Sequence, residues 1–135
     1  GPLLQRGRVD LAITGADRIT RRGEVLSTVG TYLQALAAKD NGVAFYVAAP
    51  SSAIAWELHD GFTEMPLEEH GAPEVTWIHG QTADGHFHTV RVVPAPSPVA
   101  HYASDITRAA LITGLITERG LCEATELALG RMFGK

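Results

Sequence analysis

An acid and a base follow directly on a short apolar run near the start of the chain. The run VDLAIT, residues 9–14, ends at Gly15, and the next polar residues are Asp17 and Arg18. This pattern predicts a strand that then turns toward a helix, and open parallel sheets bind their ligands at the carboxyl ends of their strands. A carboxylate there, half screened from water by apolar strands, could move protons on a bound substrate. Asp17 is therefore the first candidate for a catalytic residue, and the alternative is an Asp that closes the turn by binding backbone amides.

The arginines near Asp17 form the only basic cluster in the sequence. They are Arg18, Arg21 and Arg22. Guanidinium groups in this position could bind the phosphate or another anionic group of a substrate, and Arg18 could instead pair with the carboxylate beside it. A solvated loop explains the cluster equally well.

Hydroxyl side chains mark two further turns. Ser27 or Thr28 is predicted to cap a helix that runs to about residue 41, and the free N–H groups at its start could bind phosphate. Ser51 and Ser52 follow a proline at the end of the next predicted strand and could line the same crevice. For both pairs, ordinary capping and turn formation are the alternative.

The six histidines do not predict a metal site. They are His59, His70, His79, His86, His88 and His101. His79, His86 and His88 fall on a predicted hairpin and could together bind zinc, but no Cys or carboxylate completes a recognised spacing, so no metal is expected. The other three have no evident partner, although His101 and Asp105 could face the crevice. No Gly-x-Gly-x-x-Gly or Walker pattern follows a strand, so no nucleotide cofactor is expected.

The composition is that of a globular protein. With 135 residues, of which 45% are hydrophobic and 19% charged, the chain is expected to form one domain. Its formal net charge of −4 excludes the broad basic surface of a nucleic-acid-binding protein. No apolar run approaches the roughly 20 residues of a membrane span. The single cysteine, Cys122, fits a reducing cytoplasm and is expected to be a packed or surface thiol rather than a nucleophile.

Alternating strand and helix patterns predict the fold class. Strands are predicted over residues 9–14 and 43–49, and helices over residues 28–41, 107–120 and 123–133. This order is typical of an α/β fold with a Rossmann-like, mostly parallel sheet flanked by helices. The apolar residues predicted to face inward from the two long helices are Val29, Leu33, Leu36, Ala37, Leu111, Ile112, Leu115 and Ile116.

The middle of the chain departs from this alternation. Residues 75–78 and 87–93 are predicted to be strands joined through Asp84-Gly85, which makes a β-hairpin excursion from the sheet. A helical turn is predicted over residues 53–58. An edge strand or an extended loop is predicted over residues 63–69 because a proline interrupts a weak alternation there.

Several motifs of this sequence occur together, in the same order, in one known family. They are Gly15-Ala16-Asp17-Arg18, Gly30-Thr31-Tyr32, Leu36-Ala37-Ala38-Lys39, Phe45-Tyr46-Val47-Ala48, Pro50-Ser51-Ser52, Met65-Pro66-Leu67-Glu68-Glu69 and Leu115-Ile116-Thr117-Glu118-Arg119-Gly120. Through these motifs essentially the whole chain resembles the C-terminal domain of the methylthioribose-1-phosphate isomerase family. That family shares its fold with the regulatory subunits of the eukaryotic translation-initiation guanine-nucleotide exchange factor and with ribose-bisphosphate isomerases.

The resemblance implies an activity and assigns residues to it. The family converts an aldose 1-phosphate into a ketose 1-phosphate in methionine salvage, with a Cys and an Asp as the catalytic pair. The Asp matches Asp17, as proton donor and acceptor, whereas the family's Cys lies upstream of this chain and Cys122 does not match it. The family's substrate-binding Asn and Lys are replaced by Ser27 and Thr28, which removes a positive charge from the phosphate region. The family's Asn-Pro-Ala-Phe-Asp becomes His-Tyr-Ala-Ser-Asp, ending at Asp105.

The resemblance predicts one part of a longer protein. We expect a single Rossmann-like domain over residues 1–135, the C-terminal half of a larger two-domain fold whose N-terminal domain is absent. Such a chain is expected to bind a sugar phosphate through Asp17, Arg18, Ser27 and Thr28 but to be inactive alone, because the Cys and most phosphate ligands lie upstream. The alternative is a non-catalytic regulatory or assembly domain, which the loss of the Asn-Lys pair favours. The resemblance also implies a cytoplasmic protein that forms a homodimer or pairs with the missing N-terminal half.

Overall fold

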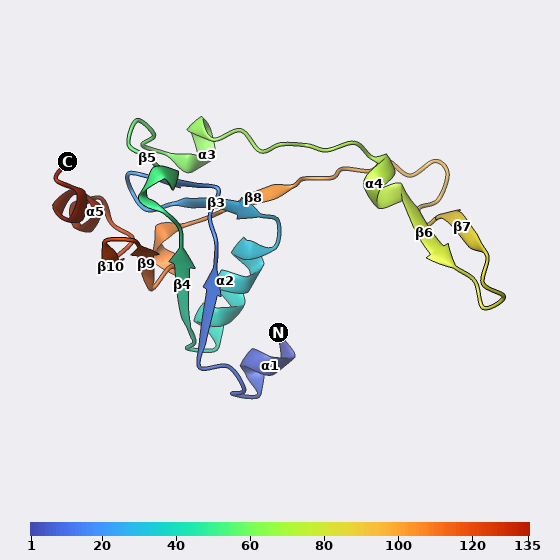
Figure 1. The fold of residues 1–135 in the computed structure, drawn as a ribbon, viewed down its shortest axis with the longest axis horizontal. Coiled ribbons are helices and arrows are strands. Elements are labelled where there is room, and N and C mark those ends of the chain that lie inside the picture. The colour runs from blue at the N-terminus through green and yellow to red at the C-terminus, as the bar shows by residue number, and fades with distance from the viewer. The chain divides into compact units, whose positions relative to one another are not determined.

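The computed structural model describes all residues, 1–135, and divides them into two compact units. Unit 1 contains Gly1–Pro66 and Ser104–Lys135, and unit 2 contains Leu67–Ala103. Figure 1 follows the chain through both units by colour. Unit 1 holds two four-stranded sheets, and unit 2 holds a two-stranded sheet.

The first sheet of unit 1 carries the parallel strands expected from the sequence. Its order is β1-β4-β9-β10, with β1 at Leu11–Thr14, β4 at Ala44–Ala48, β9 at Gly114–Thr117 and β10 at Gly120–Cys122. The first three strands are parallel, and β10 returns antiparallel to β9. The predictions of β1 and β4 are thus confirmed.

The predicted helix over residues 107–120 is wrong. The chain there leaves β8, Ser104–Thr107, passes through a short 3-10 helix, η2, at Ala109–Leu111, and then forms β9 and β10. Leu115 is fully buried and the adjacent Ile116 is half-buried, and the two residues pair with Val47 and Ala48 of β4. An apolar run this short fits a helical and a strand period about equally well, and the pairing of β9 with β4 decides between them.

The second sheet of unit 1 has the order β5-β2-β3-β8. In it β2 spans Arg18–Thr20, β3 spans Val25–Thr28 and β5 spans Ile54–Ala55. Strand β3 pairs antiparallel with both β2 and β8, which lie side by side with it in Figure 1. The chain after Asp17 therefore enters a strand rather than a helix, and the helical turn predicted over residues 53–58 is wrong because β5 lies there.

Helix α2, Thr31–Asp40, is confirmed as a helix, but its inner face is not the predicted one. Its buried residues are Thr31, Ala35 and Ala38. In contrast, Leu33 and Leu36 of the predicted face are 66% and 38% exposed. The helix packs on β4 and β8, and the small alanine side chains allow it to lie close to both strands.

A carboxylate from β8 caps the N-terminus of α2. Asp105 accepts hydrogen bonds from the Gly30 N–H at 2.6 Å and from the Tyr32 N–H at 3.0 Å. A negative charge in this position also faces the positive end of the helix dipole. Two N–H groups at the helix start are therefore occupied by Asp105, and Ser27 and Thr28 lie in β3 rather than at the cap of the helix.

One apolar core joins both sheets of unit 1 to α2 and to the C-terminal helix α5. Helix α5 spans Glu126–Phe133, which confirms the helix predicted over residues 123–133. It begins at Thr125, whose side chain accepts a hydrogen bond from the Ala128 N–H at 3.2 Å. The largest fully buried apolar side chains, which come from both sheets and from α5, are Phe45, Ile19, Leu115, Leu129, Val25 and Val47.

Two one-turn helices complete unit 1. Helix α1 spans Pro2–Gln5 and is followed by Gly7, whose φ of +60° favours glycine at the end of a helix. Helix α3 spans Gly61–Glu64 and takes up the start of the segment 63–69 that the sequence predicts to be extended. The longest helix of the chain, α2, has 10 residues, and no helix combines the length and the apolar character needed to cross a membrane.

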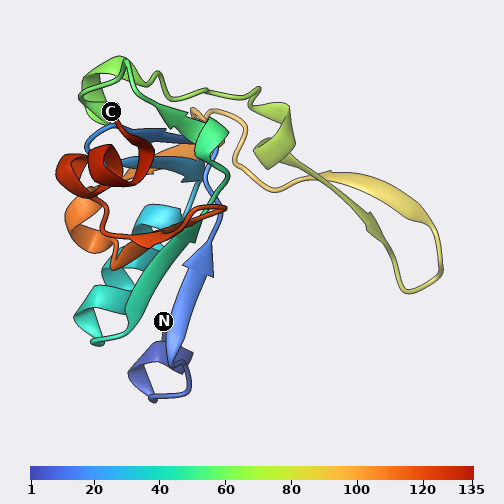
Figure 2. The same ribbon diagram turned by 60° about the vertical axis from the view of Figure 1, so that its left-hand side comes forward.

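Unit 2 consists of a hairpin and the two segments that lead into and out of it. Helix α4 spans Pro73–Thr76, strand β6 spans Trp77–Gln81 and strand β7 spans Phe87–Arg91. The two strands are antiparallel, as the sequence predicts, and Figure 2 shows them side by side. The first predicted strand begins too early, because residues 75–76 belong to α4. The turn between them contains Gly85, whose φ of +87° favours glycine.

Removal of the Asp105 carboxylate should destabilise unit 1. The substitution Asp105→Ala leaves two helix N–H groups without their charged acceptor, and we expect the free energy of unfolding to fall by about 1–3 kcal/mol. Urea titration followed by far-ultraviolet circular dichroism measures the change. The matched control is Asp40→Ala at the other end of α2, where loss of an exposed acid near the negative end of the dipole should not lower stability. Equal losses in both variants would show that the cap contributes nothing.

The two faces of α2 should respond differently to a change in side-chain size. Ala38 is fully buried, so Ala38→Leu should overpack the contact with the sheets and lower the free energy of unfolding by about 1–3 kcal/mol. Leu33→Ala, on the exposed face, should change it by less than about 0.5 kcal/mol. The same urea titration compares the two variants. A larger loss for Leu33→Ala would mean that the face predicted from the sequence is the one that packs.

Candidate functional site

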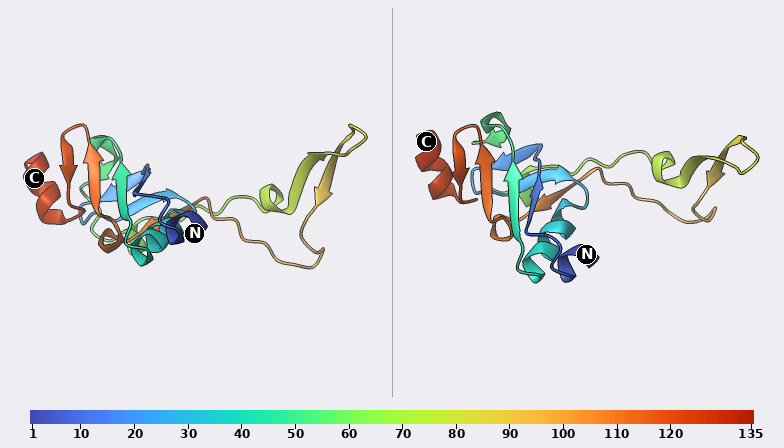
Figure 3. Two further views of the ribbon diagram at one scale, coloured as in Figure 1. Left: turned by 90° about the horizontal axis from the view of Figure 1, so that it is seen from below. Right: turned by 60° about the horizontal axis from the view of Figure 1, so that its bottom comes forward.

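The carboxyl ends of three parallel strands meet at one edge of the first sheet. Strand β1 ends at Thr14, β4 at Ala48 and β9 at Thr117. The parallel register of β1 with β4 and of β4 with β9 sets these ends beside one another, and Figure 3 shows the three strands side by side. The turns that follow the strands therefore enter the same region, which is where open α/β sheets bind ligands.

Asp17 follows β1 at this edge, and its side chain is free. The residue is exposed, and its carboxylate has no hydrogen-bond or ion-pair partner within unit 1. Only its backbone is held, because the Asp17 N–H donates to the Leu26 carbonyl at 2.9 Å. The carboxylate therefore does not close the turn. The half-screened environment predicted from the sequence is wrong for this residue, because its side chain is exposed to water. A free carboxylate on a fixed backbone can exchange a proton with a molecule that reaches this edge.

The three arginines of the basic cluster have different surroundings in the structure. Arg21 forms an ion pair with Glu126 of α5, with 2.7 Å between Nη2 and Oε1. Arg18 and Arg22 are exposed and make no ion pair within unit 1. Arg18 is the first residue of β2 and directly follows Asp17. It is therefore the cation nearest along the chain to Asp17 that remains available to an anionic ligand.

Strand β3 lies alongside the Asp17 turn and carries both hydroxyl residues. Ser27 is buried, and its Oγ donates a hydrogen bond to the Gly15 carbonyl at 3.1 Å. Thr28, the next residue of the strand, is exposed. Ser27 thus helps to fix the turn that carries Asp17, whereas Thr28 is open to a ligand.

Two residues from the other turns are joined at this edge. After β4 comes the short 3-10 helix η1, Ser51–Ala53, and the Ser51 N–H donates to the exposed Glu118 carboxylate at 2.8 Å. Hydrogen bonds from the side chain and then from the backbone of Ser51 lower the pKa of Glu118, and the Arg119 guanidinium adds to this effect. Glu118 therefore places a negative charge at the edge at neutral pH. The sequence pattern does not point to Glu118, because it predicts a helix over residues 107–120.

Cys122 has the environment of a packed thiol. It is half-buried in β10, where burial raises the pKa of its thiol and the nearby Glu123 carboxylate raises it further. A thiol with a raised pKa is a poor nucleophile at neutral pH. This agrees with the expectation from the sequence.

The histidines of the hairpin do not gather with a carboxylate, whereas two other histidines do. His79 is hydrogen-bonded through Nδ1 to the Thr89 hydroxyl at 2.9 Å, and the other two hairpin histidines are exposed. His70 and His101, which have no evident partner in the sequence, lie with their ring centroids 5.4 Å apart in unit 2. No spacing rule relates these two positions, so only the fold brings them together.

This chain matches one family model and several named proteins. Residues 1–124 match the family described as the Initiation factor 2 subunit family. The chain is 55% identical to a methylthioribose-1-phosphate isomerase of Acidiphilium cryptum over 98% of this chain and 36% of that protein. It is 54% identical to a methylthioribose-1-phosphate isomerase of Rhodospirillum centenum, with the same coverage of 98% and 36%.

Two crystal structures share the fold. The 5-methylthioribose 1-phosphate isomerase of Pyrococcus horikoshii OT3 matches with a TM-score of 0.83 and 35% identity over 98% of this chain and 34% of that chain. The translation initiation factor eIF-2B subunit delta of A. fulgidus matches with a TM-score of 0.83 and 30% identity over 100% of this chain and 36% of that chain. The chain thus spans 36% of the length of the curated relatives named above. Its mixed sheets flanked by helices are the α/β fold of these proteins, and the chain belongs to the Initiation factor 2 subunit family.

Proposed function

We propose that this chain forms the C-terminal part of a methylthioribose-1-phosphate isomerase, which converts an aldose 1-phosphate into the corresponding ketose 1-phosphate in methionine salvage. The observation that carries the proposal is the free carboxylate of Asp17 at the shared edge of three parallel strands. Relatives with the name of this enzyme, at 55% and 54% identity, support it. Because the chain covers 36% of these relatives, we assign to it a part of the active site and not the whole.

Asp17 is the proposed proton donor and acceptor. In an aldose 1-phosphate, C1 is bonded to both the ring oxygen and the phosphate, so it carries no free carbonyl group. Forming the ketose 1-phosphate breaks the bond between C1 and the ring oxygen and moves the hydrogen of C2 to C1. One proton is delivered to the ring oxygen, and another is removed from the C2 hydroxyl, which becomes the carbonyl group. A carboxyl group serves both steps because it alternates between its ionised and protonated forms. No protein group in unit 1 competes for the Asp17 carboxylate, so it is available to a substrate. Its exposure in this chain ends when the rest of the enzyme covers the edge.

Arg18 and Thr28 are the proposed contacts to the sugar phosphate. Both are exposed, and they flank the Asp17 turn from β2 and β3. A guanidinium group binds two phosphate oxygens at once, and a hydroxyl group donates a further hydrogen bond. Ser27 acts on the same site by holding the Gly15 carbonyl in place. Since Ser27 and Thr28 bring no charge, Arg18 supplies the cation at this turn.

The rest of the enzyme is proposed to pair with β1. This strand is at the edge of its sheet, and Leu11 and Ile13 are 48% and 58% exposed. Native proteins usually cover or otherwise protect an exposed strand edge, because its unpaired N–H and C=O groups can pair with another chain. Further strands would extend the parallel sheet into a Rossmann-like one within a two-domain protein, and that region would bring the catalytic Cys. A homodimer of the complete enzyme is part of the same proposal.

A regulatory or assembly role is less well supported. The match to the eIF-2B subunit delta has 30% identity, whereas the isomerase relatives reach 55%. The position of Asp17 at the edge of the sheet is compatible with a regulatory subunit as well as with an isomerase. The higher identity therefore favours the isomerase.

Asp17→Asn should abolish turnover of the complete isomerase without unfolding it. We expect kcat to fall by about 10²–10⁴-fold, the usual contribution of an acid–base group, because an amide cannot exchange the proton. Since the side chain is exposed, the free energy of unfolding should change by less than about 0.5 kcal/mol. The matched control is Asp10→Asn, another exposed acid next to β1, which should keep full activity. An unchanged kcat for Asp17→Asn would remove this residue from the mechanism.

Residues 1–135 alone should not convert methylthioribose 1-phosphate. The proposed site is divided between this chain and the part of the enzyme that carries the Cys, so neither part can complete the reaction. Nuclear magnetic resonance of the sugar phosphate over several hours would detect the ketose product. Addition of the remaining part of the enzyme should restore turnover. Conversion by residues 1–135 alone would contradict the division of the site.

A further inference from the structure

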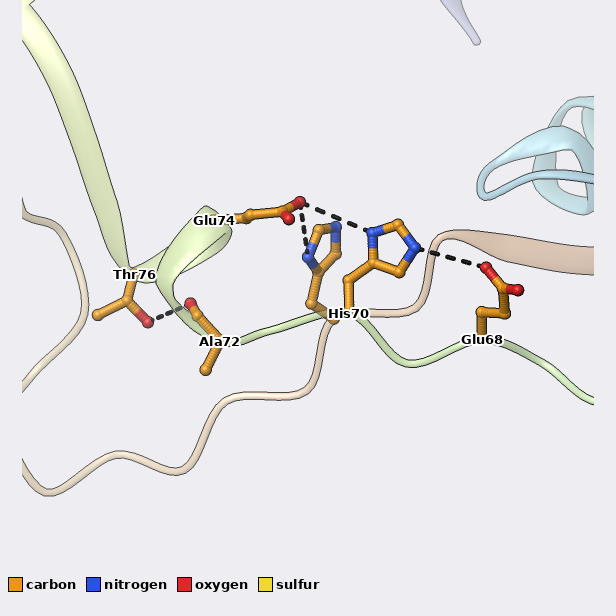
Figure 4. Close-up of polar contacts among 6 residues, drawn as sticks. Glu68, His70, Ala72, Glu74 and Thr76 are labelled. Atoms are coloured by element: carbon orange, nitrogen blue, oxygen red, sulfur yellow. Dashed lines mark hydrogen bonds and ion pairs between the residues drawn. The ribbon is translucent and has the colours of Figure 1, made fainter.

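Two imidazoles and a carboxylate lie together in unit 2. They belong to His70, Glu74 and His101. The Oε2 atom of Glu74 is 3.7 Å from Nδ1 of His70 and 3.6 Å from Nδ1 of His101. Figure 4 shows Glu74 and His70 facing each other in this cluster. One potential ligand atom of each residue lies within 4.8 Å of the other two. None of these residues has a part in the proposed isomerase site.

The backbone of unit 2 builds this cluster. The segments that enter and leave the hairpin pair through an antiparallel bridge between Glu69 and Tyr102. Directly beside this bridge, the His70 N–H donates to the His101 carbonyl at 2.7 Å, which sets the two histidines opposite each other. Glu74 lies in α4, four residues after His70, and its side chain reaches back to both rings.

One nitrogen of the cluster lacks a partner. Nδ1 of His101 is buried and has no hydrogen bond, since the nearest Glu74 oxygen is 3.6 Å away. Buried polar atoms are almost always paired, so an imidazole nitrogen that faces a carboxylate without a bond requires an explanation. In a tetrahedral zinc site with bonds of 2.0–2.1 Å, neighbouring ligand atoms are about 3.3 Å apart. The observed separations of 3.6 and 3.7 Å are therefore close to those of a metal site.

A second carboxylate lies at the far nitrogen of His70. Oε2 of Glu68 is 3.7 Å from Nε2 of His70, as Figure 4 shows. The Glu68 carbonyl is held by the Ala103 N–H at 3.1 Å, which belongs to the same pairing of the two segments. Histidines that bind a metal through one nitrogen usually donate the other N–H to a carboxylate, which fixes the tautomer and the orientation of the ring. The 3.7 Å separation is too long for a hydrogen bond, but a small shift of the Glu68 side chain would let it accept from His70 in this way.

We propose that His70, Glu74 and His101 bind one Zn²⁺ ion, with water as the fourth ligand. Two imidazoles and one carboxylate suit Zn²⁺ and related divalent transition metals, whereas Mg²⁺ and Ca²⁺ prefer sites made of oxygen atoms alone. The ion would link the chain entering the hairpin to the chain leaving it. This link stabilises the pairing of these two segments in unit 2, a unit in which few residues are buried. The proposal does not depend on the isomerase activity.

Calorimetric titration of residues 1–135 with Zn²⁺ tests the site, and Co²⁺ serves as a second probe because its visible absorption reports tetrahedral coordination. We expect one ion per chain. His101→Asn and Glu74→Gln should each weaken binding by more than about tenfold, and Glu68→Gln should weaken it by about 10–100-fold. Zn²⁺ should also slow hydrogen exchange of the His70 amide, which donates to the His101 carbonyl.

The matched control is the double substitution His86→Asn and His88→Asn, which removes two exposed imidazoles of the hairpin and should leave binding unchanged. Circular dichroism and hydrogen exchange in unit 1 identify any variant that has lost its fold. In that case protection of the His70 amide by Zn²⁺ in the unsubstituted protein decides the question. Absence of binding at one ion per chain, or binding that persists in His101→Asn and Glu74→Gln, would overturn the metal site and leave ordinary histidine–glutamate ion pairs.

Discussion

Parallel pairing on both sides of β4 is the constraint on which unit 1 depends. Tyr46 pairs with Ile13 of β1 on one side and with Gly114 of β9 on the other. The residues that flank Tyr46, Phe45 and Val47, are buried in the core, so a slip of one residue would turn both toward the opposite face. A Cβ at Gly114 would lie 2.8 Å from Cδ1 of Leu121, 3.2 Å from the Cys122 carbonyl oxygen and 3.3 Å from the Tyr46 ring, so a larger residue there would be crowded by both neighbouring strands. This register is what brings three turns to one edge.

The sequence predicts those elements whose residues have one dominant period. The apolar run of β4 and the hairpin turn at Gly85 have no strong competing interpretation, and both are confirmed. Around Leu115 the same apolar residues fit a helix or a strand, and only pairing with a distant strand decides. For α2 the helical period predicts the helix correctly, but the predicted buried face of the helix is wrong. The face with Ala35 packs against the neighbouring sheet, and the face with Leu33 is exposed. The helical period alone does not predict which of the two faces is buried.

The candidate site is predictable as far as it is local. Asp17 and Arg18 can be found from one contiguous motif, and the structure leaves the Asp17 carboxylate free on a fixed backbone. The roles of Asp105 and Glu118 could not be predicted, because each depends on a contact between segments far apart in the sequence. The same holds for the pairing of residues 68–70 with residues 101–103 in unit 2. These groups are positioned by contacts between segments far apart in the chain, and such contacts cannot be predicted from the local pattern of a single sequence.

The free edge of β1 affects how association of the isolated chain should be understood. The outer N–H and C=O groups of this strand have no partner strand, and Leu11 and Ile13 lie beside them. An uncovered edge of this kind readily adds a strand from another molecule. Two copies of residues 1–135 could therefore join through the same surface that, under the proposal above, pairs with further strands of the enzyme. Under that proposal, a dimer of residues 1–135 would report sheet addition in vitro rather than the quaternary structure of the enzyme.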